Sequence, residues 1–181
     1  MAKQFPELTD GLSRFIERQH LFFTGTAGPE GRVNVSPKGT DSLRVLSKSQ
    51  VVWQNLTGSG NETAAHLKKN NRITIMFCSF EKKPLILRLY GTARAVHPRD
   101  EQWNHFESMF RQHLGTRQFF VMDIDLVQTS CGEAVPLMDY IDERGSLDTW
   151  TENKGREGIE DYWKENNQLS IDGYETAIFN D

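Results

Sequence analysis

Short runs of alternating apolar and polar residues dominate the first two thirds of the chain. These runs have the length and the β-branched or aromatic content of strands, and clusters of turn-forming residues separate most of them. The pattern predicts strands over residues 20–27, 32–36, 42–46, 51–56, 73–80, 85–95 and 119–127. Because the strands follow one another without a regular strand–helix alternation, we expect an antiparallel barrel and not a doubly wound parallel sheet.

Helical spacing is confined to a few segments. It occurs at residues 8–16, 62–69, 100–115 and, more weakly, 159–163. Thr9 or Asp10 can cap the first helix and Asp100 the third, while the second consists of good helix formers directly after a glycine-rich turn. We therefore expect the helices to lie at the ends of the sheet.

The length of the chain suits a single domain. With 181 residues it can bury one proper core, and no linker divides it. We interpret residues 1–181 as one domain with a core at about 8–127 and a C-terminal extension of the same domain at 128–181. The net charge of -4 provides no basic footprint for a nucleic-acid backbone, so nucleic acid is not an expected partner.

The remaining composition argues against membrane, disulfide and metal sites. Apolar stretches are no longer than strands, whereas crossing a bilayer takes about 20 residues, and no apolar leader follows Met1. Cys78 and Cys131 lie far apart without Cys-x-x-Cys spacing, so we expect a cytoplasmic protein with reduced thiols and a buried Cys131. The five histidines show no pair at the spacing of a zinc site.

One candidate site is the turn Gly58-Ser59-Gly60-Asn61-Glu62-Thr63, between a predicted strand and a predicted helix. Glycines let backbone N–H groups approach an anion, and a helix N-terminus adds partial positive charge, so a phosphate would fit here. A capping box between Ser59 and Glu62 explains the same residues and is, for the turn alone, the more common arrangement. The turn lacks the third glycine of a Rossmann fingerprint.

A second candidate is Ser36-Pro37-Lys38-Gly39-Thr40, where Pro37 and Gly39 interrupt the strand pattern. Lys38 can supply a point charge for a phosphate or for negative charge on a ring. An ordinary surface turn accounts equally for the Pro-Lys-Gly sequence. Arg88 is a third candidate, because a guanidinium between Leu87 and Leu89 needs a partner if it points inward.

Taken together, these residues resemble the pyridoxamine 5'-phosphate oxidase-related family of FMN-binding split barrels. The resemblance runs from about Leu8 to Val127 and is most specific at residues 56–67, 71–77 and 84–91, and the blocks at 129–136 and 170–173 resemble one subgroup of about this length. It implies a mainly β fold, a six-stranded antiparallel split β-barrel with flanking helices. It also implies a homodimer with two FMN sites between the subunits.

The resemblance further implies which residues contact FMN. The end of one strand would run beside the flavin, a neighbouring strand would approach it, and the glycine-rich turn would lie near the phosphate. We add Arg88 to these residues, because its guanidinium could help to anchor phosphate or substrate. The predicted contacts are Ser36, Pro37, Lys38, Gly39, Trp53, Gln54, Asn55, Ser59, Gly60, Asn61, Thr63 and Arg88.

This chain also departs from the oxidase pattern. The oxidase usually carries Ser-Arg-Lys where this chain has Asn61-Glu62-Thr63, so the missing positive charge would have to come from Lys38, Arg44, Arg72 or Arg88. The tryptophan and arginine pattern that binds pyridoxal phosphate is not recognisable after Tyr140, which argues against vitamin B6 oxidation.

The sequence therefore predicts an FMN-dependent oxidoreductase acting on an unidentified small molecule, with no assigned catalytic residue. Two alternatives stay open. One is a non-catalytic module that binds or stores a flavin or haem, and the other is a deazaflavin-dependent reductase.

Overall fold

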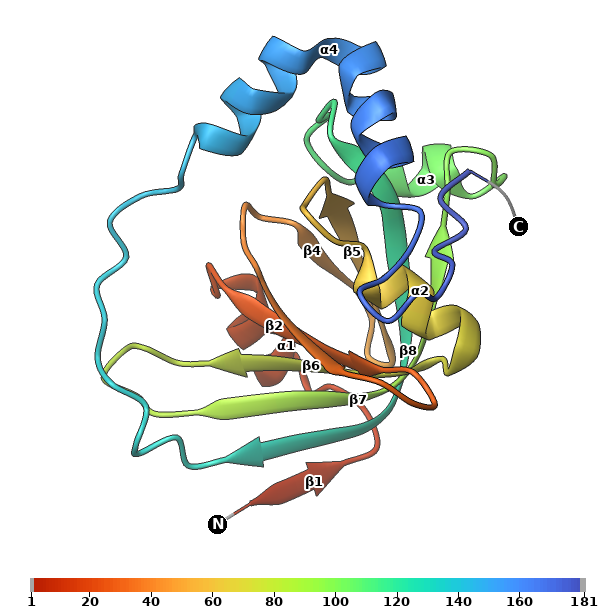
Figure 1. Cartoon of the computed structure of the whole chain (residues 1–181). Coiled ribbons are helices and arrows are strands. Elements are labelled where there is room, and N and C mark those ends of the chain that lie inside the picture. Colours follow the sequence, from red (N-terminus) through yellow and green to blue (C-terminus); the bar gives the residue numbers. More distant parts are fainter. Residues whose placement is uncertain (1, 180–181) are drawn as a thin grey trace.

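The computed structural model describes residues 2–179 and contains, within them, eight strands and four helices (Figure 1). The strands are β1 (Lys3–Phe5), β2 (Phe22–Ala27), β3 (Val33–Lys38), β4 (Leu43–Ser47), β5 (Gln50–Leu56), β6 (Arg72–Cys78), β7 (Ile86–Val96) and β8 (Thr116–Ser130). The helices are α1 (Asp10–Glu17), α2 (Glu62–Lys69), α3 (Trp103–Glu107) and α4 (Ser146–Asn166).

All eight strands form one antiparallel sheet. Its path runs β3-β2-β6-β7-β8-β5-β4, and β1 pairs with the far end of β8. The path does not close, because β3 and β4 are its two ends. This confirms the expected mainly β fold of split-barrel type with helices around it, with two strands more than the six expected.

The long strand β8 links the two halves of the sheet. It pairs with β7 along one side and β5 along the other, and a β-bulge at Tyr90/Gly91 lets the sheet bend. A Cβ at Gly91 would lie 1.9 Å from the carbonyl oxygen of Asp123, so only glycine fits at this bulge. The inner face of the bent sheet holds the core, which includes Trp53, Phe77 and Phe120.

The helices match the sequence pattern to different degrees. Helix α2 has the predicted bounds, and the Thr9 side chain caps α1 by accepting from the Leu12 N–H. Helix α3 is shorter than predicted and Asp100 does not cap it, because the Asp100 carboxylate accepts from the His97 N–H instead. Helix α4 is longer than its signal suggested and is kinked at Gly155, whose φ of 63° and ψ of 176° are not helical.

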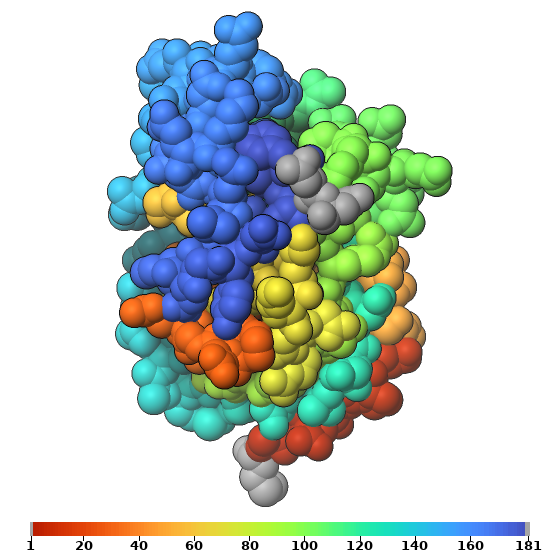
Figure 2. All heavy atoms as spheres, turned by 45° about the vertical axis from the view of Figure 1, so that its right-hand side comes forward, coloured from red at the N-terminus to blue at the C-terminus, as the bar shows by residue number. Residues whose placement is uncertain are grey.

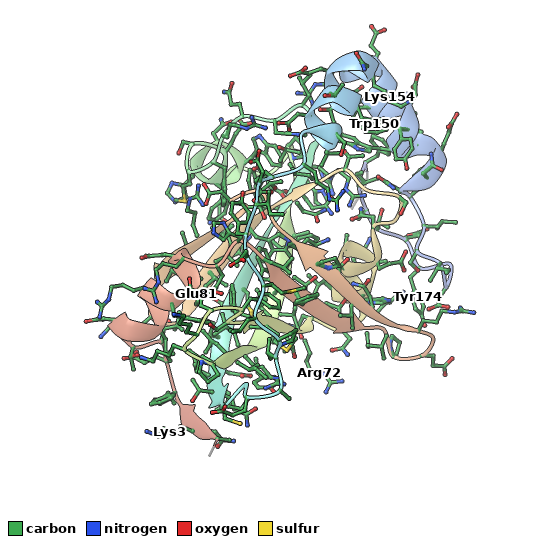
Figure 3. The ribbon with its side chains drawn as sticks, turned by 90° about the vertical axis from the view of Figure 1, so that its left-hand side faces the viewer. Lys3, Arg72, Glu81, Trp150, Lys154 and Tyr174 are labelled. Carbon is green, nitrogen blue, oxygen red and sulfur yellow. The ribbon has the colours of Figure 1, made fainter. Side chains whose placement is uncertain are left out.

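The C-terminal third wraps around the sheet. Residues 131–145 run outside the strand ends to α4, and the segment after α4 returns over α2 and the β2–β3 hairpin (Figures 1 and 2). The Tyr174 hydroxyl donates to the Glu30 carbonyl oxygen of that hairpin at 3.2 Å (Figure 3). In α4, the Lys154 ammonium lies over the Trp150 ring at 5.5 Å from its centroid (Figure 3).

Cys131 is exposed, so the expectation of a buried thiol was wrong: the residue follows the end of β8 and does not point into the core. None of the helices formed by residues 2–179 is long and apolar enough to cross a membrane.

Candidate ligand-binding cleft

A cleft of about 480 Å³ lies where the two candidate segments of the sequence meet. One wall is the end of β3 with the loop that follows it. The other wall is the end of β5 with the turn before α2. Arg117 from the start of β8 contributes to the lining, and Leu147 and Ile171 from the C-terminal extension complete it.

Ten of the twelve residues predicted to contact FMN line this cleft. They are Ser36, Pro37, Lys38, Gly39, Gln54, Asn55, Ser59, Gly60, Asn61 and Thr63. Pro37 does not interrupt β3, because β3 is an edge strand where a missing N–H is tolerated. The sheet thus brings together two segments that are about 20 residues apart in sequence, although their contact with FMN stays a prediction.

Trp53 and Arg88 do not line the cleft. Trp53 is fully buried in the core, 4.7 Å between ring centroids from Phe120, because side chains alternate along β5 and its neighbour Gln54 takes the cleft side. Arg88 is half-buried on β7, where its guanidinium donates to the Ser130 hydroxyl at 3.1 Å.

Two other arginines proposed as sources of positive charge also lie elsewhere. Arg44 pairs with Asp41 at 2.8 Å and stacks over the Phe110 ring at 4.7 Å from its centroid. Arg72 is exposed and donates to the Asn70 side chain. Of the four cations considered from the sequence, only Lys38 faces the cleft.

The turn before α2 is not a capping box. Asn61 is the N-cap and its side chain makes no capping hydrogen bond. The Glu62 carboxylate accepts instead from the backbone N–H of Ile171, at 3.1 and 3.2 Å. Within residues 2–179, the backbone N–H groups of Ser59, Gly60 and Asn61 donate to no other protein group, and the buried Asn61 side-chain NH₂ also lacks a partner. The turn therefore presents free donors to a ligand.

Arg117 lines the cleft but was not among the candidates from the sequence. Its side chain is buried, and it donates to the Gly60 carbonyl oxygen at 2.9 Å and to the Asn167 side chain at 2.7 Å. Its Nε has no partner among the residues that the structure describes. Among the described residues no carboxylate forms an ion pair with it. Burial lowers the pKa of Arg117 to about 10, still high enough to keep it charged at neutral pH.

Lys38 and Arg117 place two positive charges beside one cleft. Burial, followed by repulsion from Arg117, lowers the pKa of Lys38 to about 8. Within the described part of the chain, the Lys38 ammonium makes a single hydrogen bond, to the neutral Ser36 hydroxyl at 3.2 Å. Since buried charges are costly unless they are paired, this arrangement is suited to an anionic ligand.

The sequence around Arg117 gives only weak evidence that this residue reaches the cleft. The polar run Thr116-Arg117-Gln118 directly precedes the apolar residues of β8, but nothing in it indicates a partner. Only the pairing of β5 with β8, which sets Asn55 opposite Gln118 and Leu56 opposite Thr116, brings the guanidinium to the turn.

Comparisons with known proteins agree on one family. A sequence profile described as pyridoxamine 5'-phosphate oxidase matches residues 8–131. The chain is 36% identical over 189 aligned positions to the pyridoxamine 5'-phosphate oxidase family protein ustO of Aspergillus flavus, covering 93% of this chain and 75% of that protein.

Solved structures show the same fold at low sequence identity. A putative pyridoxamine 5'-phosphate oxidase from Lactobacillus delbrueckii has a TM-score of 0.56 at 19% identity, over 68% of this chain and 94% of its own. HupZ from Group A Streptococcus has a TM-score of 0.52 at 16% identity, over 66% and 92%. An FAD-binding protein from Mycobacterium smegmatis has a TM-score of 0.50 at 14% identity, over 70% and 97%.

Proposed function

Because the chain belongs to the pyridoxamine 5'-phosphate oxidase family, we propose that it is a flavoprotein that binds FMN in this cleft and uses it for oxidoreduction of a small molecule. The observation that carries the proposal is the group of donors without protein partners that line the cleft among the described residues. Lys38 and Arg117 face it without a carboxylate partner among the described residues. Three consecutive backbone N–H groups of the same lining, from Ser59 to Asn61, have no acceptor within residues 2–179.

Arg117 and the backbone N–H groups of the turn suit the phosphate of FMN. Successive free N–H groups before a helix form a concave anion site, and the helix N-terminus adds partial positive charge. Arg117 takes the place of the cations that the oxidase pattern has in the turn itself. The side-chain NH₂ of Asn61 and Nε of Arg117, which have no partner in the described residues, are further donors that a bound anion would satisfy.

Lys38 and the extension would act on the ring portion of the ligand. FMN supplies hydride or electron transfer when it is bound. Lys38 would stabilise negative charge on the reduced ring through its ammonium group. Leu147 and Ile171 would exclude water from the same cleft with their apolar side chains.

The lining favours a flavin over haem. No histidine, cysteine, methionine or tyrosine occurs among the described residues that line the cleft, so this chain offers no axial ligand there for haem iron. The polar lining of hydroxyl, amide and cationic groups instead suits a ligand with a phosphate and a polar ring edge.

We also propose that the protein is a homodimer. Val33 and Val35 of β3 are 72% and 67% exposed, and the exposed arm that follows β8 carries Leu137, Met138 and Ile141. Such apolar surface is typical of a protein–protein interface. Arg88 lies outside the cleft of its own chain, so it would reach a bound ligand only from a second copy.

Purified protein titrated with FMN tests the binding proposal. We expect a yellow complex. An Arg117→Met or Lys38→Met variant whose melting temperature is not lowered should bind FMN about tenfold more weakly, since a hydrogen bond to a charged group contributes about 1.5 kcal/mol or more. Arg72→Met, which removes an exposed arginine away from the cleft, is the matched control.

Failure of the wild-type chain to bind FMN would refute the proposal. Bleaching of the complex by a nicotinamide cofactor without oxygen supports reductase activity, and a complex that stays oxidised with every donor supports a storage module. Binding of a deazaflavin in preference to FMN would support the deazaflavin alternative.

A further inference from the structure

Asn167 connects the C-terminal extension to the turn before α2. It follows the last residue of α4 and is fully buried. Its side-chain NH₂ donates to the carbonyl oxygens of Gly58, at 3.1 Å, and Ser59, at 3.5 Å. Its side-chain oxygen accepts from Arg117 at 2.7 Å. One amide from a distant segment thus contacts both the turn and the buried cation.

These contacts orient the backbone of the turn. Asn167 binds the carbonyls of Gly58 and Ser59, and Arg117 binds the carbonyl of Gly60. In a planar trans peptide the C=O and the following N–H point in opposite directions. Fixing these three carbonyls therefore turns the N–H groups of the next residues away from Asn167 and from Nη1 of Arg117, the nitrogen that binds the Gly60 carbonyl. Those are the three N–H groups that have no protein acceptor among residues 2–179.

The extension is itself anchored near this point. The Thr176 hydroxyl donates to the Asn167 backbone carbonyl at 2.6 Å, and the indole N–H of Trp163 donates to the Thr57 hydroxyl at 2.8 Å. Asn167 is therefore held from both sides, and its amide has little freedom to choose other partners.

We propose that Asn167 is a positioning residue for anion binding: it sets Arg117 and the N–H groups of residues 59–61 in the geometry that receives the ligand's phosphate. This inference rests on the proposed function for the identity of the ligand. The C-terminal extension would thus have a role in the cofactor site. Asn167 itself would not contact the ligand and would act through the turn and Arg117.

Comparison of FMN with riboflavin isolates the phosphate. Asn167→Ala should raise the Kd for FMN about tenfold, the typical effect of losing hydrogen bonds to a charged group and two carbonyls, and leave the Kd for riboflavin unchanged. Asn167→Asp keeps the shape and the acceptor for Arg117, but it places a carboxylate against two carbonyls and beside the cation. It should therefore weaken FMN binding at least as much. Asn166→Ala, an exposed neighbour that donates to the Tyr162 carbonyl, is the control.

A purely structural role gives a different result. Loss of packing would weaken FMN and riboflavin in parallel, and such parallel loss in Asn167→Asp, or no loss in either variant, overturns the positioning role. Inorganic phosphate provides a readout that does not depend on flavin. It should shift the amide resonances of residues 59–61 in wild type and not in Asn167→Asp. Phosphate shifts without FMN binding would refute the proposed function alone, and equal shifts in both proteins would refute the role of Asn167.

Discussion

Replacing Lys38 with methionine should stabilise the free protein while weakening its affinity for FMN. The pKa of Lys38 lies at about 8, below its ordinary value of 10.5, because the ammonium is buried and faces Arg117. At about 1.4 kcal/mol per pH unit, keeping Lys38 charged at neutral pH costs the folded state about 3 kcal/mol. Methionine removes this cost but also the hydrogen bond to Ser36, worth about 1 kcal/mol. The expected net gain in unfolding free energy is about 2 kcal/mol at pH 7.

The same pKa shift predicts how the stability difference between wild type and Lys38→Met changes with pH. Because the pKa of Lys38 is lower in the folded state, the unfolded chain binds more protons between about pH 8 and pH 10.5. The contribution of Lys38 is therefore most unfavourable below pH 8 and disappears as the pH rises through this window. Wild-type stability should rise relative to that of the variant across the window, and the gap should close near its upper end.

Urea unfolding of both proteins at several pH values measures this effect. Lys82→Met, which removes an exposed lysine from the β6–β7 turn, serves as the control and should leave stability nearly unchanged. The reasoning fails if Lys38→Met is no more stable than wild type at pH 7, or if the gap between them does not depend on pH. FMN titration at pH 7 should show about tenfold weaker binding by the same variant.

Two further substitutions test other parts of the structure. Glu62→Gln keeps an acceptor for the backbone N–H of Ile171 but removes a negative charge from the cleft. The Kd for FMN should therefore fall about fivefold, since a unit charge at close range contributes about 1 kcal/mol in high dielectric. An unchanged Kd, as expected for the exposed control Glu81→Gln, would contradict this. Gly91→Ala should lower the unfolding free energy by about 3 kcal/mol, because its Cβ would collide with the Asp123 backbone. Urea unfolding should show no comparable loss for Gly145→Ala, where nothing lies within 4 Å.

Local sequence signals were sufficient for most elements of the fold. Helix α2 was predicted with its observed bounds, because the glycine-rich turn and the helix formers that follow it act over a few residues. Strand β1 was missed because three residues carry too short a pattern, and its place is decided by pairing with β8. Helix α4 was underestimated because an interior glycine interrupts its spacing.

Side-chain direction along a strand was harder to predict than the strand itself. Trp53 and Gln54 are neighbours on β5, and both were expected to contact the ligand, but alternation sends one to the core and the other to the cleft. Arg88 was assigned to the site for its charge, and the register of β7 places it on another face.

By itself, the sequence determined the local chemistry: a glycine-rich turn at a helix N-terminus, a lysine at the end of a strand, and the order of elements that resembles one family. Only the tertiary structure decided what completes the cleft. Arg117 and Asn167 reach the turn through β-pairing and through the return of the C-terminal segment, and these contacts join residues more than 50 positions apart. No pattern with a period of two or 3.6 residues encodes such contacts, because they depend on how whole elements pack.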